Sequence, residues 1–179
     1  LGVVAALYWG GGAGSRARET AVICAEAMVA GGALNLIMKV ATMREAPYRN
    51  LLAAAAENDT VSEGRFWTVR DGRVVGIFPS GHTQNAFIVA TVLTLRSEAR
   101  WVPWVAYPLA AAVGAGVMLE NWHWAGDVLV GAPLGWAIGR EAARARGRAR
   151  EDRAAGAPSW SFVPVAASGA PGAGLRWLF

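Results

Sequence analysis

The chain has 179 residues, of which 54% are hydrophobic and 17% are charged. In soluble domains roughly a quarter of the residues are charged. The lower charged fraction here, with apolar residues gathered in long runs, excludes an ordinary soluble domain and favours a membrane protein. The net charge of +4 comes largely from one arginine cluster. No nucleic-acid motif accompanies that cluster, so we expect no nucleic-acid partner.

A short apolar stretch and four longer apolar runs follow one another along the chain. The stretch, residues 1–9, is the expected tail of a truncated helix, and the runs cover residues 20–38, 83–95, 101–119 and 124–138. At about 1.5 Å per residue, the first and third runs approach the length that crosses a bilayer. The sequence therefore predicts an all-α fold, a multi-pass transmembrane helical bundle.

Two further segments are not predicted as membrane helices. Asp71-Gly72, flanked by residues 66–69 and 73–78, is a two-residue hairpin signal and predicts a small extramembrane hairpin before Pro79. Residues 154–158 are the expected linker to a tail that forms either a terminal hairpin or an interfacial segment. The predicted organisation is one membrane domain, 1–153, followed by a linker and C-terminal tail, 154–179.

Three groups of basic residues flank the predicted spans. They are Arg16, Arg18, Arg96, Arg100 and the arginines between 140 and 153. With four consecutive spans, these positions share one side of the membrane, which the positive-inside rule makes cytoplasmic. Lys39, His82 and His123 then fall together on the opposite face, which predicts a site there.

The first candidate motif is Pro79-Ser80-Gly81-His82, at the entrance to an apolar helix. Ser80 is a good N-cap residue, and the N–H groups at a helix start bind anions. Gly81 lets a ligand approach the backbone closely, and His82 can donate a proton to a leaving oxygen. The competing interpretation is an ordinary helix cap beside an interfacial histidine.

The second motif is His123-x-x-x-Asp127, whose spacing puts both side chains on one helix face. A carboxylate beside an imidazole fixes its tautomer and stabilises the imidazolium, and such a histidine can attack phosphorus. On the same side, Lys39 is a candidate phosphate ligand. The alternatives are a hydrated interfacial pair and a lysine that reaches the membrane surface. A metal site is disfavoured because no third or fourth ligand stands at a usual spacing.

Together the motifs resemble the type 2 phosphatidic acid phosphatase family, which shares its site with vanadium haloperoxidases. The family pattern is K-x6-R-P, then P-S-G-H, then S-R-x5-H-x3-D, and the match extends from Lys39 to Asp127. The second element and the H-x3-D element match in full. The resemblance implies that residues 1–153 form a membrane phosphatase-like domain.

Both family arginines are replaced in this chain. Ala46 stands at the first arginine position, before the expected proline, and Val117 stands at the second. Arg44 and Arg49 lie near the first gap and are candidate substitutes. A charge-assisted hydrogen bond contributes roughly 1.5–3 kcal/mol, so an uncompensated loss of both arginines slows phosphoryl transfer by roughly two to four orders of magnitude.

The resemblance implies a two-step reaction without metal or cofactor. His123 attacks the phosphorus of a phosphomonoester or diphosphate while Asp127 orients it, His82 protonates the leaving group, and water then hydrolyses the phosphohistidine. The expected phosphate ligands are Lys39, the Ser80 hydroxyl, the Gly81 N–H and, as a substitute, Arg44. The expected substrate is a lipid phosphate at the outer face of the cell membrane. Phosphatidate, phosphatidylglycerol phosphate and undecaprenyl diphosphate are all candidates, and a soluble phosphate is the less favoured alternative.

Two rival functions follow from the same residues. Ala46 and Val117 favour a catalytically weak or inactive homologue that binds lipid phosphates or a partner. A cation within reach of His123 and His82 would favour activity instead. A haloperoxidase would need bound vanadate, and the short chain with its membrane spans argues against it.

Overall fold

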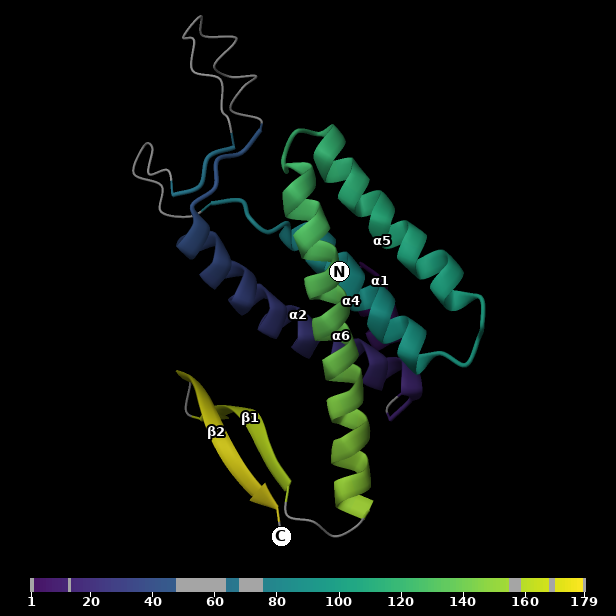
Figure 1. Cartoon of the computed structure of the whole chain (residues 1–179). Coiled ribbons are helices and arrows are strands. Elements are labelled where there is room, and N and C mark those ends of the chain that lie inside the picture. Colours follow the sequence, from purple (N-terminus) through teal and green to yellow (C-terminus); the bar gives the residue numbers. More distant parts are fainter. Residues whose placement is uncertain are drawn as a thin grey trace, which may run out of the picture. The chain divides into compact units, whose positions relative to one another are not determined.

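The computed structural model describes residues 2–12, 14–47, 64–67, 76–154, 159–167 and 170–178. The chain divides into two compact units, Leu1–Ala143 and Arg144–Phe179. The predicted helical fold is confirmed in the first unit (Figure 1). Its helices are α1 (Gly2–Gly10), α2 (Arg16–Thr42), α4 (Gly81–Arg96), α5 (Val102–Leu119) and the first part of α6 (Ala125–Ala154).

Local signals explain where these helices begin and end. Ser15 caps α2 by accepting a hydrogen bond from the Arg18 N–H at 3.2 Å, and Met43, in the left-handed conformation with φ 43°, ends it. The helix α6 continues to Ala154, well past the predicted end of the last apolar run. Alanine, arginine and glutamate dominate this extension, and all three are strong helix formers.

Helix α4 lies in the middle of the bundle, with α2, α5 and α6 packed around it (Figure 1). Three glycines of α6, four residues apart, face backbone carbonyl groups of α4 and its N-cap: Gly131 faces Ser80, Gly135 faces Gln84 and Gly139 faces Ile88. A Cβ at Gly135 would lie 2.1 Å from the Gln84 oxygen, so only glycine permits this approach. The close contact of the two helices fixes the start of α4 against the start of α6.

The turn of the predicted extramembrane hairpin, Asp71-Gly72, lies outside the described residues. The described segments beside it, 64–67 and 76–78, hydrogen-bond to the chain around the end of α2. These bonds join Trp67 N to Thr42 O at 2.7 Å, Glu45 N to Arg65 O at 3.0 Å, Gly76 N to Lys39 O at 3.1 Å and Ile77 N to Arg44 O at 3.1 Å. Residues 64–67 and 76–78 thus lie against the C-terminal end of α2.

The second unit contains the end of α6 and a two-stranded antiparallel sheet. Strand β1 (Ser159–Ala167) pairs with β2 (Ala170–Leu178), in the register Ser159 with Leu178 and Ala167 with Ala170. The tail therefore forms the terminal hairpin, one of the two alternatives predicted for it. The predicted division of the chain into 1–153 and 154–179 stays a prediction.

Candidate active site

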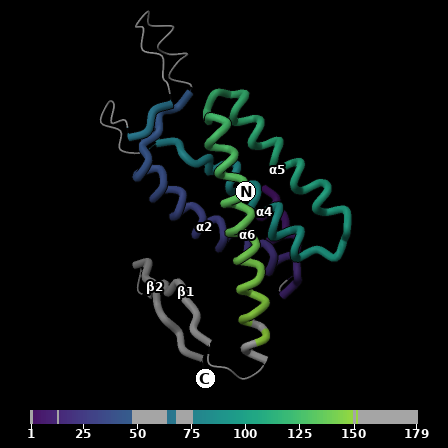
Figure 2. Tube along the Cα trace, viewed as in Figure 1, coloured from purple at the N-terminus to yellow at the C-terminus, as the bar shows by residue number. Residues whose placement is uncertain are grey.

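Three segments that are distant in sequence meet at one end of the helical unit. They are the end of α2, the Pro79–His82 segment and the connection from α5 to α6, which the trace in Figure 2 follows. The Ser80 N–H donates to the Asp127 carbonyl oxygen at 3.0 Å, and the Asn35 amide donates to the Pro79 carbonyl at 3.2 Å. Backbone and side-chain hydrogen bonds therefore hold the three segments together.

His123 and Asp127 form a buried pair at the start of α6. The His123 Nδ1 lies 3.3 Å from Asp127 Oδ2, and the side chains are 7% and 0% exposed. The Trp124 N–H donates to the same carboxylate oxygen at 2.9 Å. Because Nδ1 faces the carboxylate, Nε2 is the nitrogen of His123 left to meet a substrate.

Arg44 completes this buried arrangement from the other side of the carboxylate. Its Nη1 forms an ion pair with Asp127 Oδ1, and its Nε donates to the Gly64 carbonyl at 3.1 Å. The guanidinium carbon lies 4.8 Å from the centre of the Phe66 ring and 5.8 Å from that of Trp124. These contacts use two of the five guanidinium N–H donors.

His82 and Lys39 lie beside the buried pair. The His82 side chain is exposed, and its ring centre is 6.5 Å from that of His123 and 5.7 Å from that of Trp122. Lys39 is half-buried and lies close enough to interact electrostatically with both Asp127 and His82. The structure therefore brings together the two histidines, the carboxylate and the lysine that the sequence singled out.

Ser80 and Gly81 lie at the start of α4. The Ser80 oxygen is buried and accepts hydrogen bonds from the Thr83 N–H at 3.4 Å and the Thr83 hydroxyl at 3.0 Å. Ser80 is thus the N-cap of α4, as predicted, and its own hydroxyl hydrogen remains to be donated. A Cβ on Gly81 would come within 3.3 Å of the Asn35 side-chain oxygen, which leaves little space there. Phosphate binding by Ser80 and Gly81 stays a prediction.

The two positions of the family arginines hold small or apolar buried side chains. Ala46 is 3% exposed and Val117 is 8% exposed. The Val117 carbonyl accepts hydrogen bonds from the N–H groups of Trp122 and His123, at 3.0 and 3.2 Å, and so shapes the turn before α6. Arg44 places a cation at the site, and Arg49 lies outside the described residues.

Sequence reasoning missed a buried pair of amides beneath the site. Asn35, which is 6% exposed, donates to Gln84 Oε1 at 3.0 Å as well as to Pro79. Gln84 is fully buried. The available signal was an amide in an otherwise apolar run, four residues before Lys39 and therefore on the same helix face. Among the described residues, no group of three or more His, Cys, Asp or Glu is arranged to hold a metal ion.

A helical bundle with two histidines, a buried carboxylate and a lysine gathered at one end fits the family that the motifs resemble. The family model described as the PAP2 superfamily matches residues 20–151. The chain therefore belongs to the PAP2 superfamily, and the resemblance is confirmed.

One relative carries a functional name. A lipid A 1-phosphatase of Porphyromonas gingivalis is 39% identical to this chain over 71 residues. The aligned region covers 38% of this chain and 16% of that protein, so the chain matches only a small part of the relative's length. No solved structure matches the chain significantly.

Proposed function

We propose that the protein is a membrane phosphatase that hydrolyses a lipid phosphate or diphosphate through a phosphohistidine intermediate. The observation that carries the proposal is the buried series Arg44–Asp127–His123, with the His82 ring centre 6.5 Å from that of His123. A histidine held by a buried carboxylate suits a nucleophile, and a second, exposed histidine suits the acid. Membership of the PAP2 superfamily and the similarity to a lipid A 1-phosphatase support the same function.

In the first step, Nε2 of His123 attacks phosphorus and forms a nitrogen–phosphorus bond. The bond from phosphorus to the leaving oxygen breaks, and protonated His82 gives that oxygen its proton. Asp127 keeps the proton of Nδ1 facing the carboxylate, which stabilises positive charge on His123 as the bond forms. Arg44 holds Asp127 in place and adds a positive charge near the developing negative charge.

In the second step, a water molecule attacks the phosphohistidine. Neutral His82 accepts a proton from this water, the nitrogen–phosphorus bond breaks, and phosphate leaves. The positive charge of Lys39 and the N–H groups of the first turn of α4, which begins at Gly81, lie where they can stabilise the phosphate oxygens. The hydroxyl hydrogen of Ser80 is a further donor in this proposal. No metal ion takes part in this scheme.

A bilayer is the environment that the surface of the helical unit favours. Trp104, Leu119 and Leu129 are 80%, 81% and 72% exposed, an arrangement that suits contact with lipid rather than water. Two helices, α2 and α5, are long and apolar enough to cross a membrane. Four spans and a multi-pass topology in the cell membrane remain part of the proposal.

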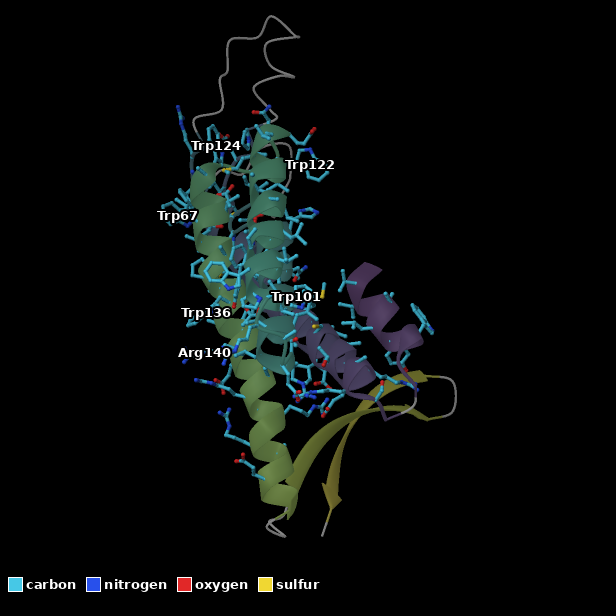
Figure 3. All side chains as sticks on the ribbon, turned by 90° about the vertical axis from the view of Figure 1, so that its right-hand side faces the viewer. Trp67, Trp101, Trp122, Trp124, Trp136 and Arg140 are labelled. Carbon is cyan, nitrogen blue, oxygen red and sulfur yellow. The ribbon has the colours of Figure 1, made fainter. Side chains whose placement is uncertain are left out.

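Tryptophan and arginine side chains mark the two ends of this unit. Figure 3 shows Trp122 and Trp124 near the connection between α5 and α6, with Trp136 and Arg140 farther along α6. Tryptophan is enriched at both membrane interfaces, and arginine at the cytoplasmic one. We therefore place the site at the non-cytoplasmic face and the arginine-rich segment, 140–153, in the cytoplasm.

The second candidate is a weak or inactive homologue that binds lipid phosphates or a partner. The buried Ala46 and Val117 favour it, because neither offers a charged donor where the family has arginine. Against it stands Arg44, which brings a guanidinium to the carboxylate that orients His123. On balance the geometry supports hydrolysis, at a rate that depends on how well Arg44 compensates.

The experiment is phosphate release by the full-length protein in detergent, from a panel that contains phosphatidate, phosphatidylglycerol phosphate, undecaprenyl diphosphate and lipid A. We expect release from at least one lipid in the presence of EDTA, a phosphoprotein intermediate that survives alkali, and a loss of roughly a thousandfold or more in His123→Ala. The matched control is Glu98→Ala at the opposite end of the unit, which should release phosphate normally.

Each departure from these results has a defined meaning. Release that persists unchanged in His123→Ala would overturn the proposed nucleophile. Release that stops with EDTA would overturn metal independence. Binding of a lipid phosphate without any release by the parent protein would establish the second candidate instead.

A further inference from the structure

A cavity of about 800 Å³ begins beside His82 and lies among α1, α2, α4 and α5. Its polar side chains, His82 and Asn85, both come from the first turns of α4. The remaining lining is apolar and comes from alanine, valine, leucine and methionine side chains. The cavity is therefore polar where it meets the candidate active site and apolar elsewhere.

The direction of the cavity follows from the helices that line it. Along α4 its lining runs from His82 to Leu93, a rise of roughly 16 Å at 1.5 Å per residue. The Tyr107 hydroxyl donates to the Thr91 hydroxyl at 3.3 Å, so the early part of α5 lies beside the late part of α4. Ala106, which also lines the cavity, therefore lies near Leu93 at the end remote from His82.

We propose that this cavity, the tail groove, receives the hydrocarbon tail of the phosphate substrate and that its remote end limits the tail length. The inference rests on the proposed function of the same site. The groove adjoins that site, because His82 lines it and the ring centre of His82 lies 6.5 Å from that of His123. Its length also matches the depth of one leaflet, which is roughly 15 Å, half of the hydrocarbon core.

The polar end of the tail groove fits the linker between a phosphate and its tail. The Asn85 side-chain oxygen is buried and has no hydrogen-bond partner among the described residues. A buried acceptor of this kind is stabilised by a donor, and a hydroxyl or amide N–H of the linker supplies one. Phosphate at His82, linker at Asn85 and tail along α4 together define the chemistry of an amphiphile.

The test is a comparison of tail lengths at a fixed headgroup, using octyl, dodecyl and hexadecyl phosphate as probes. In Ala106→Phe the added ring fills the remote end of the tail groove and displaces the last methylenes of a long tail. We expect kcat/KM for hexadecyl phosphate to fall about tenfold relative to octyl phosphate, because each buried methylene contributes to binding. The octyl value itself should stay near that of the parent.

The matched control is Ala112→Phe, which adds the same ring to the exposed face of α5, away from the cavity. It should leave the ratio of hexadecyl to octyl hydrolysis unchanged. The same ratio in Ala106→Phe and the parent would overturn the tail groove while leaving the proposed hydrolysis intact. A ratio that falls equally in both variants would also overturn it, because the effect would then come from the membrane surface.

A second measurement does not depend on turnover. A hexadecyl phosphate with a diazirine near its tail end should label the peptides that contain Leu93 or Ala106 in the full-length protein. Unlabelled hexadecyl phosphate should compete for this labelling, and Ala106→Phe should reduce it. Labelling confined to exposed positions such as Leu129 would overturn the inference, even for a protein that releases no phosphate.

Discussion

Both ends of the helical unit carry an ion pair, and at the site end the carboxylate of the pair also contacts a histidine. At the end remote from the site, Arg96 pairs with Glu19 and joins the end of α4 to the start of α2. At the site end, Arg44 pairs with Asp127, whose other oxygen faces His123. Both cations are largely buried, with side chains 14% and 16% exposed. Burial of an ion pair alone therefore does not identify a site; a carboxylate shared with a histidine does.

Among the changes that separate the two ends, removal of the cation at the site end has the largest expected effect. We expect Arg44→Ala to lower kcat/KM for the best lipid phosphate roughly ten- to hundredfold, because a charge-assisted hydrogen bond to Asp127 is lost. The kcat/KM of Arg44→Lys should lie between those of the parent and Arg44→Ala. Lysine keeps the charge but lacks the planar guanidinium that contacts Asp127 and Gly64 at once. Phosphate release in detergent measures both.

Arg96→Ala is the matched control at the remote end. It removes an arginine of similar burial and should lower the apparent melting temperature while leaving kcat/KM within about twofold, since Arg96 lies at the opposite end of α4 from His82. An Arg44→Ala variant with unchanged kcat/KM would show that the Arg44–Asp127 pair is only structural, as the Arg96–Glu19 pair is expected to be. The difference between the ends would then disappear.

The sequence was sufficient to predict the helices and the meeting of Lys39, His82 and His123, because hydropathy and motif spacing report on each directly. It identified Arg44 only as a neighbour of the missing arginine. The contact with Asp127 depends on the left-handed residue Met43, which ends α2, and on the return of residues 64–67 to that point. Such reversals depend on tertiary contacts that no local pattern encodes.

The close approach of α6 to α4 was not predicted either, although the sequence contains a pattern that favours it. The glycines at 131, 135 and 139 repeat every four residues, which is the pattern that lets helices approach closely. The pattern does not say which helix is the partner. The structure shows that it is α4, and this contact places the Asp127 carbonyl against the Ser80 N–H.

The next largest effect is expected from the amide pair of Asn35 and Gln84, beneath the Pro79–His82 segment. Asn35→Leu leaves the buried Gln84 oxygen without its donor, so we expect a loss of about 1–3 kcal/mol in the free energy of unfolding. It also removes the hydrogen bond to the Pro79 carbonyl, which should lower kcat more than it raises KM. Thermal unfolding and steady-state phosphate release separate the two effects.

The double variant Asn35→Leu/Gln84→Leu distinguishes positioning from packing. Replacing both partners with apolar groups is close to neutral for stability, so unfolding should recover while kcat stays low. Leu36→Ala, at an exposed position on the same helix, is the control and should leave kcat unchanged. A double variant that recovers both stability and kcat would show that the amides only pack the helices.

The smallest expected effect is at the exposed ion pair of the remote end. Arg16 and Glu98 form this pair with side chains 57% and 83% exposed, so water and salt screen it strongly. A double-mutant cycle of Arg16→Ala and Glu98→Ala should give a coupling energy below about 0.5 kcal/mol, which falls further when salt is raised. The same cycle on Arg44 and Asp127, read from kcat/KM, should give a coupling several times larger, because one partner is fully buried and orients the proposed nucleophile. Equal coupling energies at the two ends would mean that burial and the contact with His123 do not strengthen the interaction of Arg44 with Asp127. That result would contradict the role proposed for Arg44.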